Sequence, residues 1–279
     1  LYRVSFAARG LGAAGGTAVS GPVFCNWDIG CPGPEWQTHA TVFAVPHVLA
    51  PDNAWLRFGQ WHVAGQVGFD AVSVVPVTPL YTVAAGLELG EGESLEGHTY
   101  RFDAPLGGAG RNHSRPLAVN RCGFNSNRWV FGADSEVVYR HALGMRLQTA
   151  VRVQVTVGWH AGGRLEVDAR AADGPWTPLG GLDALGTLET EVPAALLPAA
   201  AIDVRLRAVA KARVGAAESD PGSFQVHGYT YAATLDGAPA TARGETRYLE
   251  VAGPADGYAV GTFDLGDASP GGDAVASVA

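Results

Sequence analysis

The chain has almost no lysine and no long apolar run. A single lysine, Lys211, stands against 18 arginines, and the formal net charge is -8. Because no run of basic residues occurs, the chain lacks the electrostatic footprint of a nucleic-acid-binding protein. We expect no membrane insertion, since no stretch of about 18 apolar residues occurs. No signal peptide is visible, yet Leu1 opens the chain within a strand-like pattern, which indicates processing or a cut from a longer polypeptide.

Cysteine is also scarce, with three residues in the chain. Cys25 and Cys31 lie in a loop rich in turn-forming residues, and we predict that they form a disulfide, which implies an oxidising, extracytoplasmic compartment. A zinc site is the weaker alternative, because the spacing is longer than the usual two to four residues and only His39 lies nearby in sequence. Cys122 is expected to be a buried apolar residue rather than a nucleophile.

The motifs of well-known catalytic centres are missing as well. The sequence contains no HExxH, no phosphate-binding P-loop and no serine nucleophile elbow with His and Asp partners. Glu136, Glu166 and Asp168 are candidates for the paired carboxylates of a glycosidase. However, Glu166 and Asp168 alternate with apolar residues in a strand, where such side chains usually face solvent. We therefore assign no catalytic residues.

A period of two runs through almost the whole chain. Apolar and polar residues alternate in segments such as 2–6, 39–43, 151–157 and 164–168, as they do in half-buried antiparallel strands. Turn-forming clusters separate these segments, and only residues 193–201 offer a helical turn. Many short strands at spacings of about ten residues predict an all-β protein built from antiparallel β-sandwiches.

The chain also repeats itself once. The pattern VPxxLxP occurs at 45–51 and again at 192–198, and an Arg-bearing apolar run and an alternating strand follow each copy. Working backwards, residues 2–6 fall opposite residues 151–155. The second copy has many further strand-like residues before this point, and the first copy has one residue. A unit of about 150 residues has the size of a domain.

The repeat predicts three parts of the chain. Residues 1–77 are expected to form the C-terminal half of a sandwich domain, residues 87–235 a complete one, and residues 244–279 a strand-rich tail that resembles the start of a further β domain. Turn-forming residues at Val77–Tyr81 and Asp236–Ala240 are expected to be the linkers between these parts.

The first part carries a family resemblance. The segments Tyr2–Gly10, Trp36–Phe43, Leu56–Gly59 and Gly65–Val74 follow one another in order. The series resembles the second half of galactose-binding-like jelly rolls, in particular carbohydrate-binding modules of the family 4/9 type. In the second part, the hairpin at 168–179 is similar to one that is common in such sandwiches. The resemblance implies two tandem antiparallel jelly-roll domains, followed by the tail.

Modules of this type often hold a structural calcium ion between an N-terminal acidic segment and the second Asp of the last strand. Here no such segment precedes the first part, and Ala71 occupies the position of that Asp. The resemblance therefore implies no calcium site in the first part, because calcium needs six to eight oxygen ligands. It leaves a structural calcium ion in the second part open without assigning residues, and we expect no other cofactor.

Sugar-binding surfaces of β-sandwiches typically stack aromatic rings on sugar faces and bind hydroxyl groups with Asn, Gln, Asp or Arg. The expected glycan-binding residues are Gln60, Trp61, His62, Trp27, Asn125, Asn127, Arg128 and Trp129. A second polar cluster lies at 111–115. For the Asn and Ser residues of both clusters, side-chain capping of turns is the alternative. Trp36 and Trp55 lie in the apolar alternation and are expected in the core.

The resemblance thus implies a non-catalytic polysaccharide- or glycan-binding region of a larger bacterial protein that is secreted or exposed on the cell surface. The alternative is a structural or assembly protein, in which strands from another chain or from the tail complete the first part. Self-association by strand exchange would then follow, because an open sheet edge templates a new strand. A fragment of a polysaccharide-degrading enzyme is the third and least favoured option.

Overall fold

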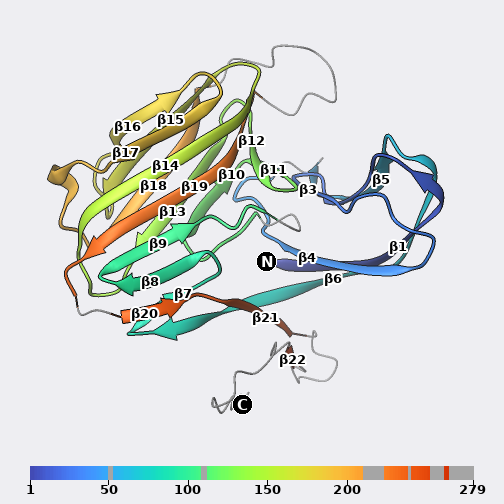
Figure 1. Ribbon diagram of the computed structural model, residues 1–279, viewed down its shortest axis with the longest axis horizontal. Coiled ribbons are helices and arrows are strands. Elements are labelled where there is room, and N and C mark those ends of the chain that lie inside the picture. Colours follow the sequence, from blue (N-terminus) through green and yellow to red (C-terminus); the bar gives the residue numbers. More distant parts are fainter. Residues whose placement is uncertain (50–52, 108–111, 210–222, 238–239, 252–260, 264–279) are drawn as a thin grey trace.

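The computed structural model describes residues 1–49, 53–107, 112–209, 223–237, 240–251 and 261–263. Nearly all of its regular structure is β (Figure 1), and a short 3-10 turn, η2, spans Ala194–Leu196. No helix in these ranges is long and apolar enough to cross a membrane. The expected all-β class with antiparallel sheets is confirmed.

Residues 2–76 form a small lobe at one end of the molecule (Figure 1). It has two three-stranded layers, in the orders β4-β1-β6 and β3-β2-β5. The strands are β1 (Tyr2–Ala14), β2 (Thr17–Pro22), β3 (Cys25–Asp28), β4 (Gln37–Phe43), β5 (Leu56–Trp61) and β6 (Ala64–Ala84). Only residues 64–76 of the long β6 pair with β1.

Residues 87–235 form a large lobe, which is a jelly-roll-like sandwich of two sheets. One sheet has the order β10-β13-β18-β15-β16; in the other, β19 is flanked by β14 and β17 on one side and by β9, β8, β12 and β11 on the other. The strands are β7 (Leu87–Leu89), β8 (Glu93–Gly97), β9 (Thr99–Asp103), β10 (Leu117–Arg121), β11 (Gly123–Asn125), β12 (Arg128–Phe131), β13 (Glu136–Ala142), β14 (Gln148–His160), β15 (Arg164–Ala171), β16 (Thr177–Leu182), β17 (Gly186–Glu191), β18 (Ala201–Val209) and β19 (Phe224–Leu235).

The tail returns along both lobes. β20 (Ala240–Arg243) pairs with β8, β21 (Thr246–Val251) pairs with residues 77–81 of β6, and β22 (Gly261–Phe263) pairs with β21. An ion pair between Arg3 and Glu250 fastens β21 to the small lobe. Val77–Tyr81, expected to be a linker, is therefore a continuous part of β6. Of the second expected linker, residues 238–239 lie outside the described residues, as do residues 252–260 and 264–279 of the tail.

The sequence repeat is visible in the strand pairing. β1 pairs with β4 and β6, just as β14 pairs with β17 and β19. In the second layer, β2 pairs with β3 and β5, just as β15 pairs with β16 and β18. The two VPxxLxP segments connect β4 to β5 and β17 to β18. The small lobe is thus one copy of a six-strand unit that the large lobe contains in full.

Alternation along the strands explains the core of each lobe, because successive side chains point to opposite faces of a sheet. In β1, Val4, Phe6 and Ala8 are buried. The ring of Phe6 contacts Trp27 and Phe58 edge-on, at 5.7 and 5.2 Å between ring centroids. Burial of one such aromatic side chain contributes about 1.5–3 kcal/mol to folding.

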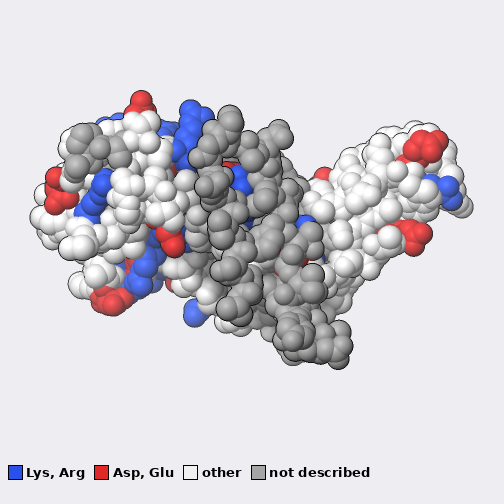
Figure 2. Space-filling model, turned by 90° about the horizontal axis from the view of Figure 1, so that it is seen from below, with Lys and Arg blue, Asp and Glu red and all other residues white. Residues whose placement is uncertain are grey.

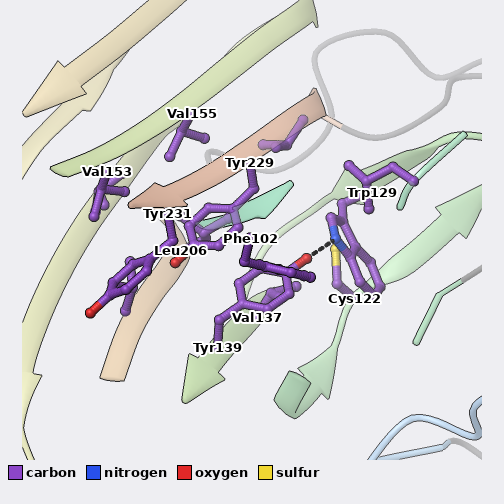
Figure 3. Close-up of a cluster of buried hydrophobic side chains, with 14 of the residues drawn as sticks. Phe102, Cys122, Trp129, Val137, Tyr139, Val153, Val155, Leu206, Tyr229 and Tyr231 are labelled. Carbon is purple, nitrogen blue, oxygen red and sulfur yellow. Dashed lines mark hydrogen bonds between the residues drawn. The ribbon is translucent and has the colours of Figure 1, made fainter. Parts of the chain in front are cut away.

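Aromatic side chains from both sheets fill the core of the large lobe (Figure 3). The rings of Tyr139 and Tyr229 stack at 4.3 Å, and Phe102 packs beside them. The indole Nε1 of Trp129 donates a hydrogen bond of 2.9 Å to the hydroxyl of Tyr139. This bond satisfies the one polar atom of a fully buried indole, which would otherwise destabilise the core.

His141 is buried in the same core. Its Nε2 lies 2.9 Å from the hydroxyl of Tyr229 and its Nδ1 3.4 Å from that of Tyr100, which in turn donates to Glu93. Because the Tyr100 hydroxyl donates to the carboxylate, it accepts from Nδ1–H, and Nε2 accepts from Tyr229. Burial lowers the pKa of His141 well below its ordinary value, and the charge of Arg115 adds to this effect. The imidazole is therefore neutral in the folded protein.

The two lobes share one sheet. β3 of the small lobe pairs in parallel with β11 of the large lobe, with Cys25 opposite Phe124 and Asn26 opposite Asn125. A second contact lies at the end of β4, where the side chain of Asn112 bonds both backbone groups of Ala44, at 2.8 and 2.9 Å. The layer β3-β2-β5 is thereby continuous with the larger sheet of the large lobe (Figure 1).

The pairing of β3 corrects the predicted disulfide. All three cysteines lie in the described part of the chain, and none forms a disulfide. Cys25 points into the core beside the junction, whereas Cys31 is exposed beyond the end of β3. The two residues are held apart because Cys25 belongs to a strand and not to the loop. With this correction, the cysteines no longer support an oxidising compartment.

We expect all three thiols to titrate in the denatured, unreduced protein. In the native protein only Cys31 is expected to react quickly, because Cys25 and Cys122 are buried and burial raises the pKa of both thiols. Thiol titration with a chromogenic disulfide reagent, with and without denaturant, measures both quantities. A count of one thiol after denaturation would restore the disulfide and contradict the structure.

We also expect the free energy of unfolding to decrease as the pH is lowered past about 6.5, which is the pKa of histidine in an unfolded chain. The folded-state pKa of His141 is lower, so its stabilising contribution is complete above this pH and decreases on acidification, by at most about 1.4 kcal/mol per pH unit. Urea unfolding between pH 7.5 and 5 measures the slope. His141→Gln should reduce the slope, and the control His62→Gln, at an exposed histidine, should not. Equal slopes in the wild type and His141→Gln would sink this account.

Candidate functional site

Polar side chains form one row on the outer face of the shared sheet, the face turned away from both cores. The row crosses six neighbouring strands in the order β5, β2, β3, β11, β12 and β19. It consists of the side chains of Arg57, Asn26, Asn125, Arg128 and His227, together with Gly21, which has no side chain. We call these residues the polar row. With about 4.8 Å between strands, it extends over roughly 24 Å.

The outward direction follows from the neighbours of these residues in each strand. Trp27, Phe58 and Trp129 all point into a core, and each precedes or follows a residue of the row. Because side chains alternate between faces, the row residues point outward. Direct pairing places Arg57 beside Gly21, Asn26 beside Asn125, and Asn125 beside Arg128.

Hydrogen bonds link the row across the junction between the lobes. The guanidinium of Arg57 donates to Oδ1 of Asn26. Nδ2 of Asn26 donates to Oδ1 of Asn125 at 3.2 Å and to Oδ1 of Asp28 at 2.8 Å. The backbone N–H of Ser126 donates to the carbonyl of Asn26 at 2.7 Å. The centre of the row is therefore fixed by contacts between the lobes.

Glycine at position 21 allows Arg57 to cross β2. The residue has a φ of +99°, and a Cβ atom there would lie 2.7 Å from the carbonyl oxygen of Cys25. Any other residue would be strained in this conformation and would clash with β3. The long side chain of Arg57 lies over this position and reaches Asn26 on the next strand.

A second glycine lies at the other end of the row. A Cβ atom on Gly158 would lie 2.4 Å from Nδ1 of His227, so only glycine leaves space for the imidazole. Burial lowers the pKa of His227, and the nearby charge of Arg128 adds to the shift. Nη1 of Arg128 donates to Oδ1 of Asn127 at 2.8 Å. The row thus ends in a neutral imidazole beside a guanidinium.

Some of the expected glycan-binding residues lie on or near the polar row. Asn125 and Arg128 belong to it, and Asn127 is exposed at the turn between them. Trp61 lies on the same face of β5 as Arg57 and is 54% exposed, with its ring against His62. Gln60 alternates with Trp61 and donates to the carbonyl oxygens of the following turn, at 3.1 and 3.4 Å. Gln60 therefore supports the turn.

The structure places two expected contact residues elsewhere. Trp27 and Trp129 are 9% and 1% exposed and belong to the cores of the two lobes. Neither ring is available to stack on a sugar, because alternation turns both away from the row. The converse holds for Trp36 and Trp55, expected in the core, which are 44% and 49% exposed. Trp36 lies under the guanidinium of Arg9, at 4.6 Å.

Sequence reasoning missed Asn26, Arg57 and His227. Alternation around Cys25 and Trp27 points Asn26 outward, and this signal was available in the sequence. The pairing that brings Asn26 to Asn125 joins residues 99 positions apart. No local pattern indicates that pairing, so the row as a whole could not be assembled from the sequence.

The part of the 111–115 cluster that the structure describes, residues 112–115, has a structural role; Arg111 lies outside the described residues. Asn112 clamps Ala44, and the ring of His113 lies 3.1 Å from the carbonyl oxygen of Val42. Arg115 binds Glu93 through two hydrogen bonds beneath the surface. These side chains fasten the small lobe and close the buried chain of polar groups that leads to His141. They leave no free set of donors for a sugar.

A cavity of about 230 Å³ lies where the two lobes and the tail meet. His47, Tyr81, Asn120 and Tyr248 are among its lining residues. Asn120 is buried; its Oδ1 accepts from the backbone of Cys122, and its Nδ2 has no hydrogen-bond partner among the described residues. None of the expected glycan-binding residues lines this cavity.

Metal ligands do not gather in the described ranges. No group of three or more His, Cys, Asp or Glu side chains there has the geometry to hold a metal ion. Glu166 and Asp168, considered above as paired carboxylates, bind Arg207 instead, and Asp168 also binds Arg205. These carboxylates are thus engaged in ion pairs on the face of β15.

Comparisons with known proteins add little. No family model and no curated protein matches the chain. Among solved structures, the Gx strain of infectious bursal disease virus gives 10% identity and a TM-score of 0.26, covering 87% of this chain and 58% of that one. The VP2 subviral particle of the same virus gives 9% and 0.24, covering 83% and 56%. The chain spans less than two thirds of these viral chains, and scores this low carry no argument about it.

Proposed function

We propose that the protein binds a glycan chain along the polar row, with Trp61 at one end. The observation that carries the proposal is the row itself, which presents hydrogen-bond donors and acceptors in a line across both lobes. Arg57 and Arg128 donate, and the amide of Asn125 both donates and accepts. Asn26 is 8% exposed, and its amide holds these side chains in line through its bonds to Arg57, Asn125 and Asp28. Such groups match the hydroxyl groups of a sugar chain, which occur at regular intervals along an extended molecule.

The shape of the face supports this proposal. Between Arg57 and Trp61, the outward position of β5 is Gly59, and a Cβ atom there would meet nothing within 4 Å. A ligand can therefore lie close to the backbone on its way to the exposed indole. Aromatic rings contribute on the order of 1 kcal/mol when they stack on an apolar face. Trp61 offers this contact without a role in either core.

The resemblance of the small lobe to carbohydrate-binding modules of the family 4/9 type supports the same function. Under this proposal the protein is a non-catalytic binding region, and its ligand is a polysaccharide outside the cell or at its surface. The assignment of compartment depends on the ligand alone, because the disulfide that also indicated it is not formed.

Substitutions of Trp61 or of a residue of the row should weaken binding without unfolding the protein. We expect Trp61→Ala and Asn125→Ala each to lower the affinity of a bound polysaccharide about tenfold, through loss of one stacking or hydrogen-bonding contact. Affinity electrophoresis on a panel of polysaccharides, with the melting temperature measured in parallel, tests this. Trp36→Ala, at an exposed tryptophan of the other layer, is the matched control. Equal losses of affinity in all three variants would show that the polar row is not the binding site.

A second candidate function, strand-mediated assembly, follows from the repeat. Val74 pairs with Val4 of β1, and Tyr231 pairs with Val153 of β14, which is the strand that corresponds to β1. Val74 and Tyr231 are therefore equivalent positions of the repeat. Tyr231 is fully buried and stacks on His141 of β13 at 3.6 Å, whereas Val74 is 41% exposed. Among the described residues, no strand pairs with the second edge of β6 over residues 64–76. Strands from another chain would complete the lobe as β9, β12 and β13 complete the large one.

Light scattering after size-exclusion chromatography tests this second function. Strand exchange predicts closed or open oligomers whose mass grows with protein concentration. Val74→Asp should return them to monomers, because a carboxylate on the covered face would be buried without a partner. A wild-type monomer at all concentrations, with protected amides over residues 66–74 in hydrogen exchange, would contradict strand exchange and leave the glycan proposal intact.

A further inference from the structure

We propose that the glycan bound by the polar row is acidic, and that Arg57 and Arg128 bind its carboxylate or sulfate groups. This inference rests on the proposed function and adds the chemical class of the ligand.

Most arginines elsewhere in the described ranges pair with carboxylates, whereas Arg9 lies over the ring of Trp36. Arg115 pairs with Glu93, and Arg140 with Asp203. On the large lobe, basic and acidic side chains lie close together (Figure 2). Arg57 and Arg128 are different. Among the described residues, no carboxylate oxygen lies within 4.0 Å of the guanidinium nitrogens of either one. Further ion pairs of this kind join Arg121, Arg152, Arg164, Arg170, Arg205 and Arg207 to acidic residues.

Both arginines also have an unused donor. Nε of Arg57 and Nε of Arg128 are shielded from solvent and have no hydrogen-bond partner among the described residues. A buried donor without a partner costs about 1–3 kcal/mol. A ligand oxygen that accepts from either Nε–H would remove this cost. The Nε–H and Nη–H edge of a guanidinium matches the two oxygens of a carboxylate or sulfate, which it binds with two parallel hydrogen bonds.

The surroundings leave the row with an excess of positive charge. The nearest carboxylate on this face of β3 is Asp28, whose Oδ1 accepts from Asn26 and whose backbone N–H is bonded to Ser126. One negative charge thus faces two guanidinium groups. Because Arg57 leans toward Asn26, the two guanidinium groups are separated by roughly 10–15 Å, two to three strand spacings. This separation suits acidic groups on different residues of one sugar chain.

The net charge of the whole protein opposes the binding of an acidic ligand anywhere outside a local positive site. With a net charge of -8, the chain as a whole repels a polyanion. Any tight binding of an acidic polysaccharide therefore requires a local site of positive charge. Such binding also weakens as salt is added, since screening acts over about 10 Å at 0.1 M ionic strength.

The test compares three probes on the full 279-residue chain by isothermal titration calorimetry. The probes are an oligogalacturonate, its carboxyl-reduced neutral counterpart and a sulfated galactan oligosaccharide, each at two salt concentrations. We expect at least one acidic probe to bind at least tenfold more tightly than the neutral one and to weaken with salt. The acidic probe that binds distinguishes a carboxylate from a sulfate ligand.

Variants assign the effect to the two arginines. Arg57→Gln and Arg128→Gln should each lower the affinity of the acidic probe at least tenfold, and Arg128→Lys should retain part of it. Arg152→Gln, at an exposed arginine on β14 that is paired with Glu189 and Glu191, should have no effect.

The outcomes separate the two proposals. Binding of the neutral probe as tightly as the acidic ones, with loss in Asn125→Ala but not in Arg57→Gln, would overturn the acidic ligand and keep glycan binding on the row. Salt-sensitive binding that Arg152→Gln weakens as much as Arg57→Gln does would also overturn the inference. If no probe binds and no polysaccharide of the wider panel binds, glycan binding itself fails.

Discussion

The short parallel pairing of β3 with β11 is the contact on which the rest of the structure depends. It continues the sheet of the large lobe into the small one, and it brings Asn26 beside Asn125. Without it, Arg57 and Arg128 would not lie on one sheet. The same pairing carries Cys25 into a strand, away from Cys31. A few backbone hydrogen bonds, worth about 1 kcal/mol each, thus keep Cys25 apart from Cys31 and bring the residues of the polar row together.

The second constraint is that the small lobe has only part of a sandwich, so the apolar face of its β6 sheet needs strands packed against it. β1 to β6 reproduce β14 to β19, yet among the described residues only the large lobe has strands over the equivalent of β6. The small lobe compensates in part: β21 extends its sheet at residues 77–81, Asn112 holds the end of β4, and β11 continues its second layer. These contacts use polar and backbone groups, which explains why residues 111–115 look like a binding cluster in the sequence.

The all-β class, the repeat and most strands were predictable, because alternation records which residues are buried. The direction of Trp129 was not, because it lies between Arg128 and Val130, and alternation indicates that Trp27 points inward only once residues 25–28 are recognised as a strand and not a loop. The predicted disulfide was wrong because sequence spacing carries no information about a pairing partner about 100 residues away. Asn125 and Arg128 were found as single residues, whereas their alignment with Arg57 depends on the register of five neighbouring strands.

Hydrogen–deuterium exchange with and without a saturating acidic oligosaccharide tests the central claim most directly, because it reports on both lobes at once. The account predicts slower amide exchange around Arg57 and Gly21 in the small lobe and, with the same ligand, at residues 125–128 in the large lobe. The distant strands β15 and β16 should not change. Protection confined to one lobe, or centred on the cavity beside Asn120, would contradict a site built across the shared sheet.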